Sequence, residues 1–229
     1  MDAQTLRAET FKALHERDRA FVMPNPWDAG SAVMLASLGF EALATTSAGY
    51  AFSLARPDAE GALSLEDTLI NASMIAKATA LPVSADLENG FSDTPKGCAQ
   101  TILRAAATGI VGGSIEDATG IASIRRLQAY AEAGADVLYA PALRSAEEVL
   151  AVVKAVAPKP VNVLMSGGLN LSVAQLSAMG VRRISVGSAL ALAAYGEFYR
   201  AAQEVYELGT FTFTERKMPF RQANQFFKG

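Results

Sequence analysis

Short apolar segments alternate with amphipathic ones along almost the whole chain, and this alternation constrains the fold more than any other feature of the sequence. Seven apolar segments are predicted as strands, at about residues 21–23, 42–46, 83–85, 109–116, 136–139, 161–165 and 183–186. The segments between them have the spacing of helices, and several follow a capping residue such as Asp28 or Ser64. Strands that alternate with helices are typical of a parallel sheet covered by helices. We therefore predict a single α/β domain over residues 1–229.

Composition narrows the class of protein. At 229 residues the chain is near the lower end of the range for an eight-unit α/β barrel, and its 51% of hydrophobic residues can form a large core. The net charge of −3 gives no electrostatic reason to expect a nucleic acid or an anionic membrane as a partner. The one cysteine, Cys98, excludes an internal disulfide, and the first 19 residues lack the pattern of a secretion signal. We expect a soluble, cytoplasmic protein.

Acidic side chains follow two neighbouring strands of the predicted sheet. Because side chains alternate along a strand, Ser84, Asp86 and Glu88 are expected on one face, and the next strand ends at Glu116. Like charges that are held together are costly, and a divalent cation would offset their repulsion. Each acid could instead cap a helix or lie in solvent. Two such strand ends side by side favour a shared metal site formed by Asp86, Glu88 and Glu116.

Four segments of the chain resemble the isocitrate lyase/phosphoenolpyruvate mutase superfamily, and most closely its bacterial branch of uncharacterised, mutase-like proteins. These segments are residues 25–32 (NPWDAGSA), 45–49 (TTSAG), 84–90 (SADLENG) and 112–117 (GGSIED). The resemblance covers nearly the whole chain and implies a (β/α)8 TIM-type barrel that uses Mg²⁺ (or Mn²⁺). It implies a small oxo or hydroxy carboxylate as substrate, with a C–C or P–C bond cleaved or formed through an enolate. It further implies a homo-oligomer (dimer or tetramer), often with a terminal helix exchanged between neighbours.

The resemblance also implies roles for four acids. Asp86 matches the family's principal metal-side aspartate, Glu88 stands where the family has a second acid, and Glu116 matches the glutamate of the following strand. Asp58 matches an aspartate that supports the water shell of the metal. Because Mg²⁺ keeps several waters and takes few direct carboxylates, most of these acids are expected to act through water. Asp58 and Glu116 are the expected catalytic side chains.

The segment after the second strand is predicted as a loop over residues 47–58. By the resemblance, the backbone N–H groups of Ser47, Ala48 and Gly49 would hold the carboxylate of the substrate. Charge that builds on a substrate oxygen beside a metal ion would then be stabilised from both sides.

Two features of the family are missing from the chain. No Lys-Lys-Cys-Gly-His lid follows the strand of Glu116, and no strand ends in an Asn-Ala-Arg motif. Relatives have an extra helix and strand at the position between Gly120 and Ile121. We therefore predict that one βα unit, about 30 residues or more, is absent at that point. Deletion during evolution is one explanation, but the unpaired strand edges that it would leave favour a segment omitted from the sequence.

Two other functions stay open at this point. The glycine-rich segments 166–169 and 186–188 follow the last two strands, where barrels often bind phosphate, so a phosphate-ester isomerase is an alternative. The same glycines could simply form tight turns. The absent lid cysteine also leaves open a non-catalytic barrel that binds a carboxylate. His15 is the one histidine and is predicted on the surface, so a histidine-based mechanism has little support.

Overall fold

The computed structural model describes residues 1–59, 61–116 and 124–228. The strands of the described part are β1 (Phe21–Met23), β2 (Leu43–Ala44), β3 (Val83–Asp86), β4 (Gly112–Ser114), β5 (Leu138–Tyr139), β6 (Val161–Leu164) and β7 (Arg183–Ser185). Its helices are α1 (Ala3–His15), α2 (Ala29–Ser37), α3 (Ser47–Ser53), α4 (Leu65–Ala78), α5 (Pro95–Ala106), α6 (Ile124–Glu132), α7 (Ala146–Val156), α8 (Val173–Ala178), α9 (Ala189–Leu208) and α10 (Phe220–Phe226), with a short 3₁₀ helix η1 (Thr212–Glu215). The predicted alternation of strands and helices is confirmed.

All strand pairs are parallel, and they form two sheets. One has the order β1-β7-β6-β5 and the other the order β2-β3-β4. The sheets are joined where the N–H of Ala44 donates to the carbonyl of Pro24 at 3.1 Å. In the described part of the chain β4 and β5 are not paired, so the barrel is open on that side. The opening lies between the strands that flank the predicted missing unit, although Gly120 and Ile121 themselves lie outside the described residues.

Two clusters of the core follow the two sheets, and a third joins the sheets by packing Phe21 and Met23 of β1 with Ala42 and Ala44. One cluster of buried side chains, with Leu138, Val161 and Val163 at its centre, lies between β5–β7 and helices α6–α8. A second cluster, which includes Ile75 and Val83, lies between β2–β4 and helices α2, α4 and α5. The apolar strand segments of the sequence therefore bury their outward side chains against helices, as expected for parallel strands.

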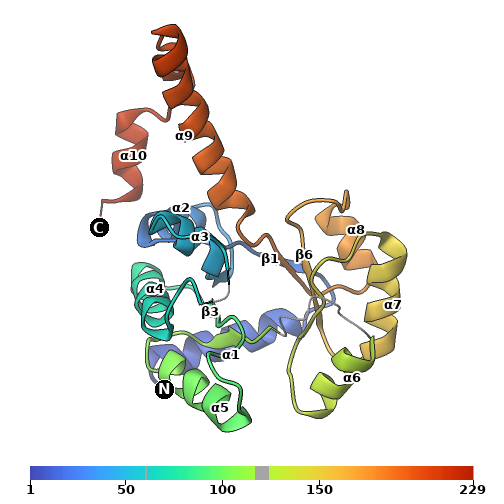
Figure 1. The fold of residues 1–229 in the computed structure, drawn as a ribbon. Coiled ribbons are helices and arrows are strands. Elements are labelled where there is room, and N and C mark those ends of the chain that lie inside the picture. The colour runs from blue at the N-terminus through green and yellow to red at the C-terminus, as the bar shows by residue number, and fades with distance from the viewer. Residues whose placement is uncertain (60, 117–123, 229) are drawn as a thin grey trace.

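Helix α1 lies across the amino-terminal end of the barrel (Figure 1). The side chains of Phe11, Leu14 and His15 on its inner face are buried. The prediction that His15 lies on the surface is wrong. Its ring packs edge-on against Phe11 and Phe21, with centroid distances of 4.7 and 5.0 Å. The separation of four residues places Phe11 and His15 on one helix face, and the apolar partner carries the histidine inward.

The segment after β2 is also more ordered than predicted. Residues 47–53 form α3 rather than a loop, and Thr46 caps this helix by accepting a hydrogen bond from the N–H of Gly49. The capping pattern is a local one, since threonine is a favoured residue at a helix N-cap. A turn then carries the chain to Asp58, which is exposed.

The C-terminal segment leaves the body of the molecule (Figure 1). Ala191 is the one residue of α9 that is buried. Farther along, large side chains are exposed, including Phe198, Tyr199, Tyr206, Leu208, Phe211 and Phe220. Helix α10 then returns toward α2. Among the described helices, none has both the length and the apolar character needed to cross a membrane.

Candidate active site

A small cavity of about 90 Å³ lies inside the barrel, toward the carboxyl ends of the strands. Its lining includes two of the predicted acids, Asp86 from the end of β3 and Glu116 from just beyond β4. Side chains and backbone from all seven described strands, or from the residues that follow them, complete it. Barrels of this kind place their active sites at this end.

The carboxylate of Asp86 is held on both oxygens by backbone groups. Its Oδ2 accepts a hydrogen bond from the N–H of Ser47 at 3.0 Å, and its Oδ1 accepts one from the N–H of Glu88 at 3.1 Å. The N–H of Asp86 donates to the Thr45 hydroxyl at 2.9 Å. These contacts fix the orientation of the carboxylate before any ligand arrives.

Glu88 and Glu116 lie in surroundings that oppose their ionisation. Burial, reinforced by the charges of Asp86 and Asp58, raises the pKa of Glu88 to about 7. The same causes, with the charge of Glu88 added, raise the pKa of Glu116 to about 7. The two segments are also linked directly, because the N–H of Glu116 donates to the carbonyl of Glu88 at 2.6 Å. The charges of Asp86 and Asp58 therefore reach both glutamates, which places the four acids near one another.

The chemistry of this donor set suits a hard divalent cation. Within the described residues, no three histidine, cysteine or acidic side chains are placed close enough to bind an ion directly together. A cation that keeps most of its water needs fewer direct ligands, and Mg²⁺ is such a cation. Its charge would also offset the burial and the neighbouring negative charges that raise the pKa values of Glu88 and Glu116. The acids present therefore fit an ion held largely through water.

The first turn of α3 contains the residues predicted to bind the carboxylate of the substrate. The N–H of Ser47 is already used by Asp86, and the N–H of Gly49 donates to the Thr46 hydroxyl at 3.3 Å. The N–H of Ala48 has no partner among the described residues. Gly49 is packed tightly, because an added Cβ would lie 2.8 Å from Cγ2 of Thr46. Substrate binding by this turn remains a prediction, with Ala48 as the donor best placed to serve it.

Several polar side chains inside the barrel were not predicted from the sequence. Asn25 joins three segments, since its Oδ1 accepts from the N–H groups of Val186 and Gly187, both at 3.0 Å, and its Nδ2 donates to the carbonyl of Thr45. Other inward-facing polar residues are Ser84, Ser114, Tyr139, Asn162, Arg183 and Ser185. A polar residue at alternate positions of an otherwise apolar strand was the signal available in the sequence.

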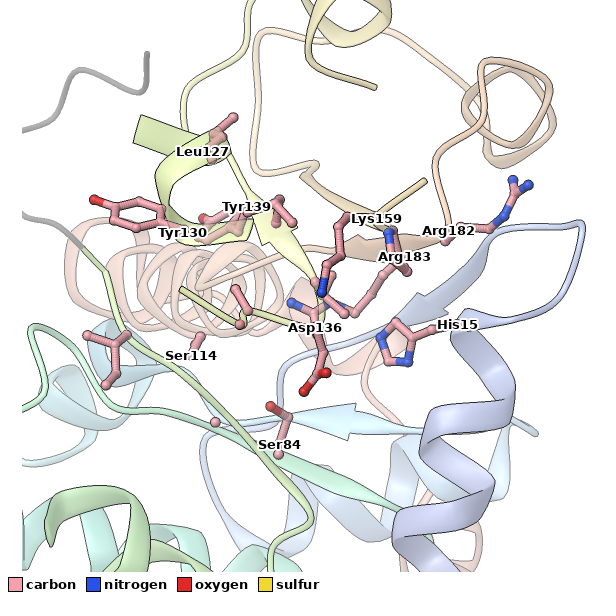
Figure 2. A pocket seen from close by; sticks show the side chains of 18 of the residues that line it. His15, Ser84, Ser114, Leu127, Tyr130, Asp136, Tyr139, Lys159, Arg182 and Arg183 are labelled. Carbon is pink, nitrogen blue, oxygen red and sulfur yellow. The ribbon is translucent and has the colours of Figure 1, made fainter. Parts of the chain in front are cut away.

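Tyr139 comes from β5 and faces the acids across the cavity. Burial, with the charges of Glu116 and Asp86, raises the pKa of its hydroxyl. The hydroxyl therefore stays protonated at neutral pH and can serve as a hydrogen-bond donor. Figure 2 shows Tyr139 in the lining of a second, larger cavity.

This larger cavity, of about 1490 Å³, lies between β4 and β5. It opens along the strand edges that are unpaired in the described chain. Figure 2 shows His15, Asp136, Lys159 and Arg183 in one part of it. Nε2 of His15 is buried and has no partner there among the described atoms. Its shape and position are those of a space that another strand could fill.

The glycine-rich segments that a phosphate-ester isomerase would use to bind phosphate form turns in this structure. Gly167, Gly168 and Gly187 all have positive φ values, of 146°, 81° and 55°, a region that favours glycine. The N–H of Gly187 is already bound by Asn25. The tight-turn interpretation therefore explains these glycines without a bound phosphate.

A parallel-stranded barrel with clustered acids at the carboxyl ends of its strands defines an α/β-barrel enzyme. Comparison with known proteins gives the family. The model of the phosphoenolpyruvate phosphomutase family matches residues 11–123 and again residues 120–206, and the chain belongs to this family, within the phosphoenolpyruvate mutase/isocitrate lyase superfamily. It is an enzyme of the lyase/mutase kind. The match is in two parts, which overlap at residues 120–123, where the missing unit was predicted.

Solved structures of relatives share the fold. A protein from Burkholderia cenocepacia J2315, described as a candidate lyase/mutase, is 46% identical, with a TM-score of 0.94 over 100% of this chain and 98% of that one. Oxaloacetate acetylhydrolase, solved with its product oxalate, is 25% identical, with a TM-score of 0.83 over 96% of this chain and 93% of that one. A 2,3-dimethylmalate lyase is 26% identical, with a TM-score of 0.83 over 96% and 92%. A curated, uncharacterised protein of Mycobacterium tuberculosis strain H37Rv is 29% identical over 78% of this chain and 82% of its own length.

Proposed function

We propose that this protein is a metal-dependent lyase or mutase that cleaves or forms a C–C (or P–C) bond in a small oxo or hydroxy carboxylate. The observation that supports this most directly is the placing of Asp86 and Glu116, from the carboxyl ends of β3 and β4, in one cavity, with the pKa values of Glu88 and Glu116 raised by burial and by the charges of Asp86 and Asp58. Carboxyl groups placed together in this way are suited to a cation and to an anionic substrate bound beside it.

Asp86 would hold Mg²⁺ (or Mn²⁺), and Glu88, Glu116 and Asp58 would orient the waters around it. The ion would supply a positive charge next to the substrate oxygen on which an enolate charge develops. The N–H of Ala48 would donate to the substrate carboxylate at the start of α3. Tyr139 would donate a hydrogen bond to the substrate from the opposite wall of the cavity, because its raised pKa keeps the hydroxyl protonated.

Binding of oxalate tests this proposal. Oxalate is a planar dianion that resembles the enolate of pyruvate, and it is the product bound by the related oxaloacetate acetylhydrolase. Calorimetric titration with oxalate should give tighter binding with Mg²⁺ than with EDTA, because two of its oxygens can face the ion. Inorganic phosphate, titrated in the same two buffers, should bind weakly.

Each other outcome selects an alternative. Phosphate binding without metal, and no response to oxalate, would contradict the lyase/mutase proposal and favour a phosphate-ester isomerase that uses Gly167, Gly168 and Gly187. Metal-dependent oxalate binding with no turnover of any oxo acid would favour the carboxylate-binding barrel without catalysis.

We further propose that the protein works as a homo-oligomer in the cytoplasm. The apolar face of α9 supports the first part, since Phe198 and Tyr206 are 71% and 91% exposed. An apolar surface of this kind on one long helix is suited to a second copy of the chain. The cytoplasmic location is supported by the single cysteine, Cys98, which is not in a disulfide.

A further inference from the structure

A chain of three buried polar side chains runs across the inside of β6 and β7. Arg183 is 8% exposed, Asn162 is 2% exposed and Ser185 is 7% exposed. Nε of Arg183 donates to Oδ1 of Asn162 at 3.0 Å, and Nδ2 of Asn162 donates to Oγ of Ser185 at 3.0 Å. The parallel register, in which Asn162 lies beside Arg183, holds the first contact in place.

The chemistry of these groups fixes the direction of every hydrogen bond. A guanidinium can only donate, so the amide oxygen of Asn162 must face Arg183. The amide nitrogen must then face Ser185, whose oxygen accepts. The hydroxyl proton of Ser185 is thus left for another acceptor. None of the described protein atoms accepts it.

Ser185 lies in the lining of the same small cavity as Asp86 and Glu116. A ligand with a hydrogen-bond acceptor that enters this cavity could accept a hydrogen bond from the Ser185 hydroxyl. The buried positive charge of Arg183, which has no carboxylate bound to it among the described residues, favours an anion over a neutral ligand there. The bound anion would thus lie between the metal cation on one side and the Ser185 hydroxyl, with the positive charge of Arg183 behind it, on the other.

We propose that Ser185 binds the substrate by donating its hydroxyl to an oxygen of the bound carboxylate, and that Asn162 and Arg183 are positioning residues that hold the hydroxyl in this direction. This inference rests on the proposed function, because it assumes that an anionic oxo or hydroxy acid occupies the cavity. It adds a specificity determinant on β7, a strand to which the predicted site residues do not belong.

Oxalate titration in the presence of Mg²⁺ tests the proposal with three variants of the full chain. Ser185→Ala removes the donor and should weaken oxalate binding about tenfold, as expected for one hydrogen bond to a charged group. Ser185→Thr retains a hydroxyl and should bind within about threefold of the wild type. Ser37→Ala, at an exposed serine whose hydroxyl donates to a carbonyl of its own helix α2, serves as the control and should change nothing.

Asn162→Asp separates a positioning role from a purely structural one. The new carboxylate can still accept from Arg183, but it has no N–H for Ser185, so the hydroxyl would turn and donate to it instead. Oxalate binding should weaken by the same factor as in Ser185→Ala, and the double variant should be no weaker than either single one. The rise in melting temperature caused by Mg²⁺ alone should persist in all variants.

The outcomes distinguish the two proposals. If the wild type binds oxalate only with metal and Ser185→Ala binds it equally well, the proposed function stands and the role of Ser185 is wrong. Additive losses in the double variant would reduce Asn162 to a structural residue. If the wild type shows no metal-dependent oxalate binding, both proposals are overturned.

Discussion

The backbone N–H of Ser47 donates a hydrogen bond to Oδ2 of Asp86, with 3.0 Å between the two atoms. This contact joins the first turn of α3 to the end of β3, although the two residues lie 39 positions apart in the chain. Asp86, which would hold the proposed cation, is therefore bonded directly to the turn that would bind the substrate carboxylate. A substitution at either position should alter the geometry of the other.

Asp86→Asn should remove the response of the protein to metal. Mg²⁺ stabilises the folded wild type by mass action, by about 2.7 kcal/mol at a hundredfold excess over its dissociation constant. The variant keeps the shape of the side chain but loses its charge, so its melting temperature should not change with Mg²⁺. Asp18→Asn, at an exposed acid before β1, should respond like the wild type. Equal responses in both variants would remove the metal site from β3.

The stability of the metal-free protein should fall as pH rises. The pKa values of Glu88 and Glu116 are raised to about 7 by burial and by neighbouring carboxylates, from ordinary values of 4.5. Between these values the folded state holds protons that the unfolded state has lost, so its free energy of unfolding decreases with pH. Urea unfolding in EDTA from pH 5 to pH 8 measures this decrease.

Glu116→Gln is the matched variant for that experiment and should flatten the decrease. His15 has the opposite effect, because burial lowers its pKa to about 4 from 6.5, so its contribution to stability increases with pH over that interval. The comparison of variant with wild type at each pH cancels this contribution. A slope unchanged by Glu116→Gln would show that this carboxyl ionises normally.

The mass of the intact protein should exceed the mass of the 229 residues in its sequence. The sequence corresponds to 24.0 kDa, and one further βα unit would add about 3 kDa or more. The addition is supported by the unpaired edges of β4 and β5 in the described chain and by the family match, which is in two parts that overlap at residues 120–123. Intact-mass spectrometry of the protein from its natural source decides the question. A mass of 24.0 kDa would mean a true seven-strand chain and would weaken the case for catalysis.

Phe198→Glu should shift the protein toward the monomer. The charge would lie on the apolar face of α9, where it opposes burial against a second copy. Light scattering coupled to size exclusion measures the change in mass. Leu38→Glu, at an equally exposed leucine after α2, is the control and should leave the assembly intact. A wild type that is already monomeric would contradict the proposed oligomer.

The sequence predicted the elements whose signals are local. Asp28 and Ser64 were recognised as capping residues, and each accepts the expected capping hydrogen bond. The acids after β3 and β4 could also be found, because parallel strands bring their carboxyl ends together. Helix α3 was missed because Thr46 was interpreted as the end of a strand rather than as a cap.

The interior of the barrel could not be predicted in the same way. Asn162 lies in a strand whose other residues are apolar, and its partner Arg183 comes from a position about 20 residues away. Only the register between β6 and β7 shows that they meet. His15 was misplaced for a similar reason, since its burial depends on Phe21 of the first strand.

The gap between β4 and β5 also affects how the described chain should unfold. The cluster around Leu138 and Val161 and the cluster around Ile75 and Val83 have no residue in common. A closed ring of strands would join the two through an unbroken ladder of hydrogen bonds, but here the ladder ends at both edges. On the other side the two halves stay joined by a third cluster, in which Phe21 and Met23 of β1 pack with Ala42 and Ala44. Opening of the half that contains β5, β6 and β7 is therefore expected to start at the edge of β5 that is unpaired in the described chain, far from this junction.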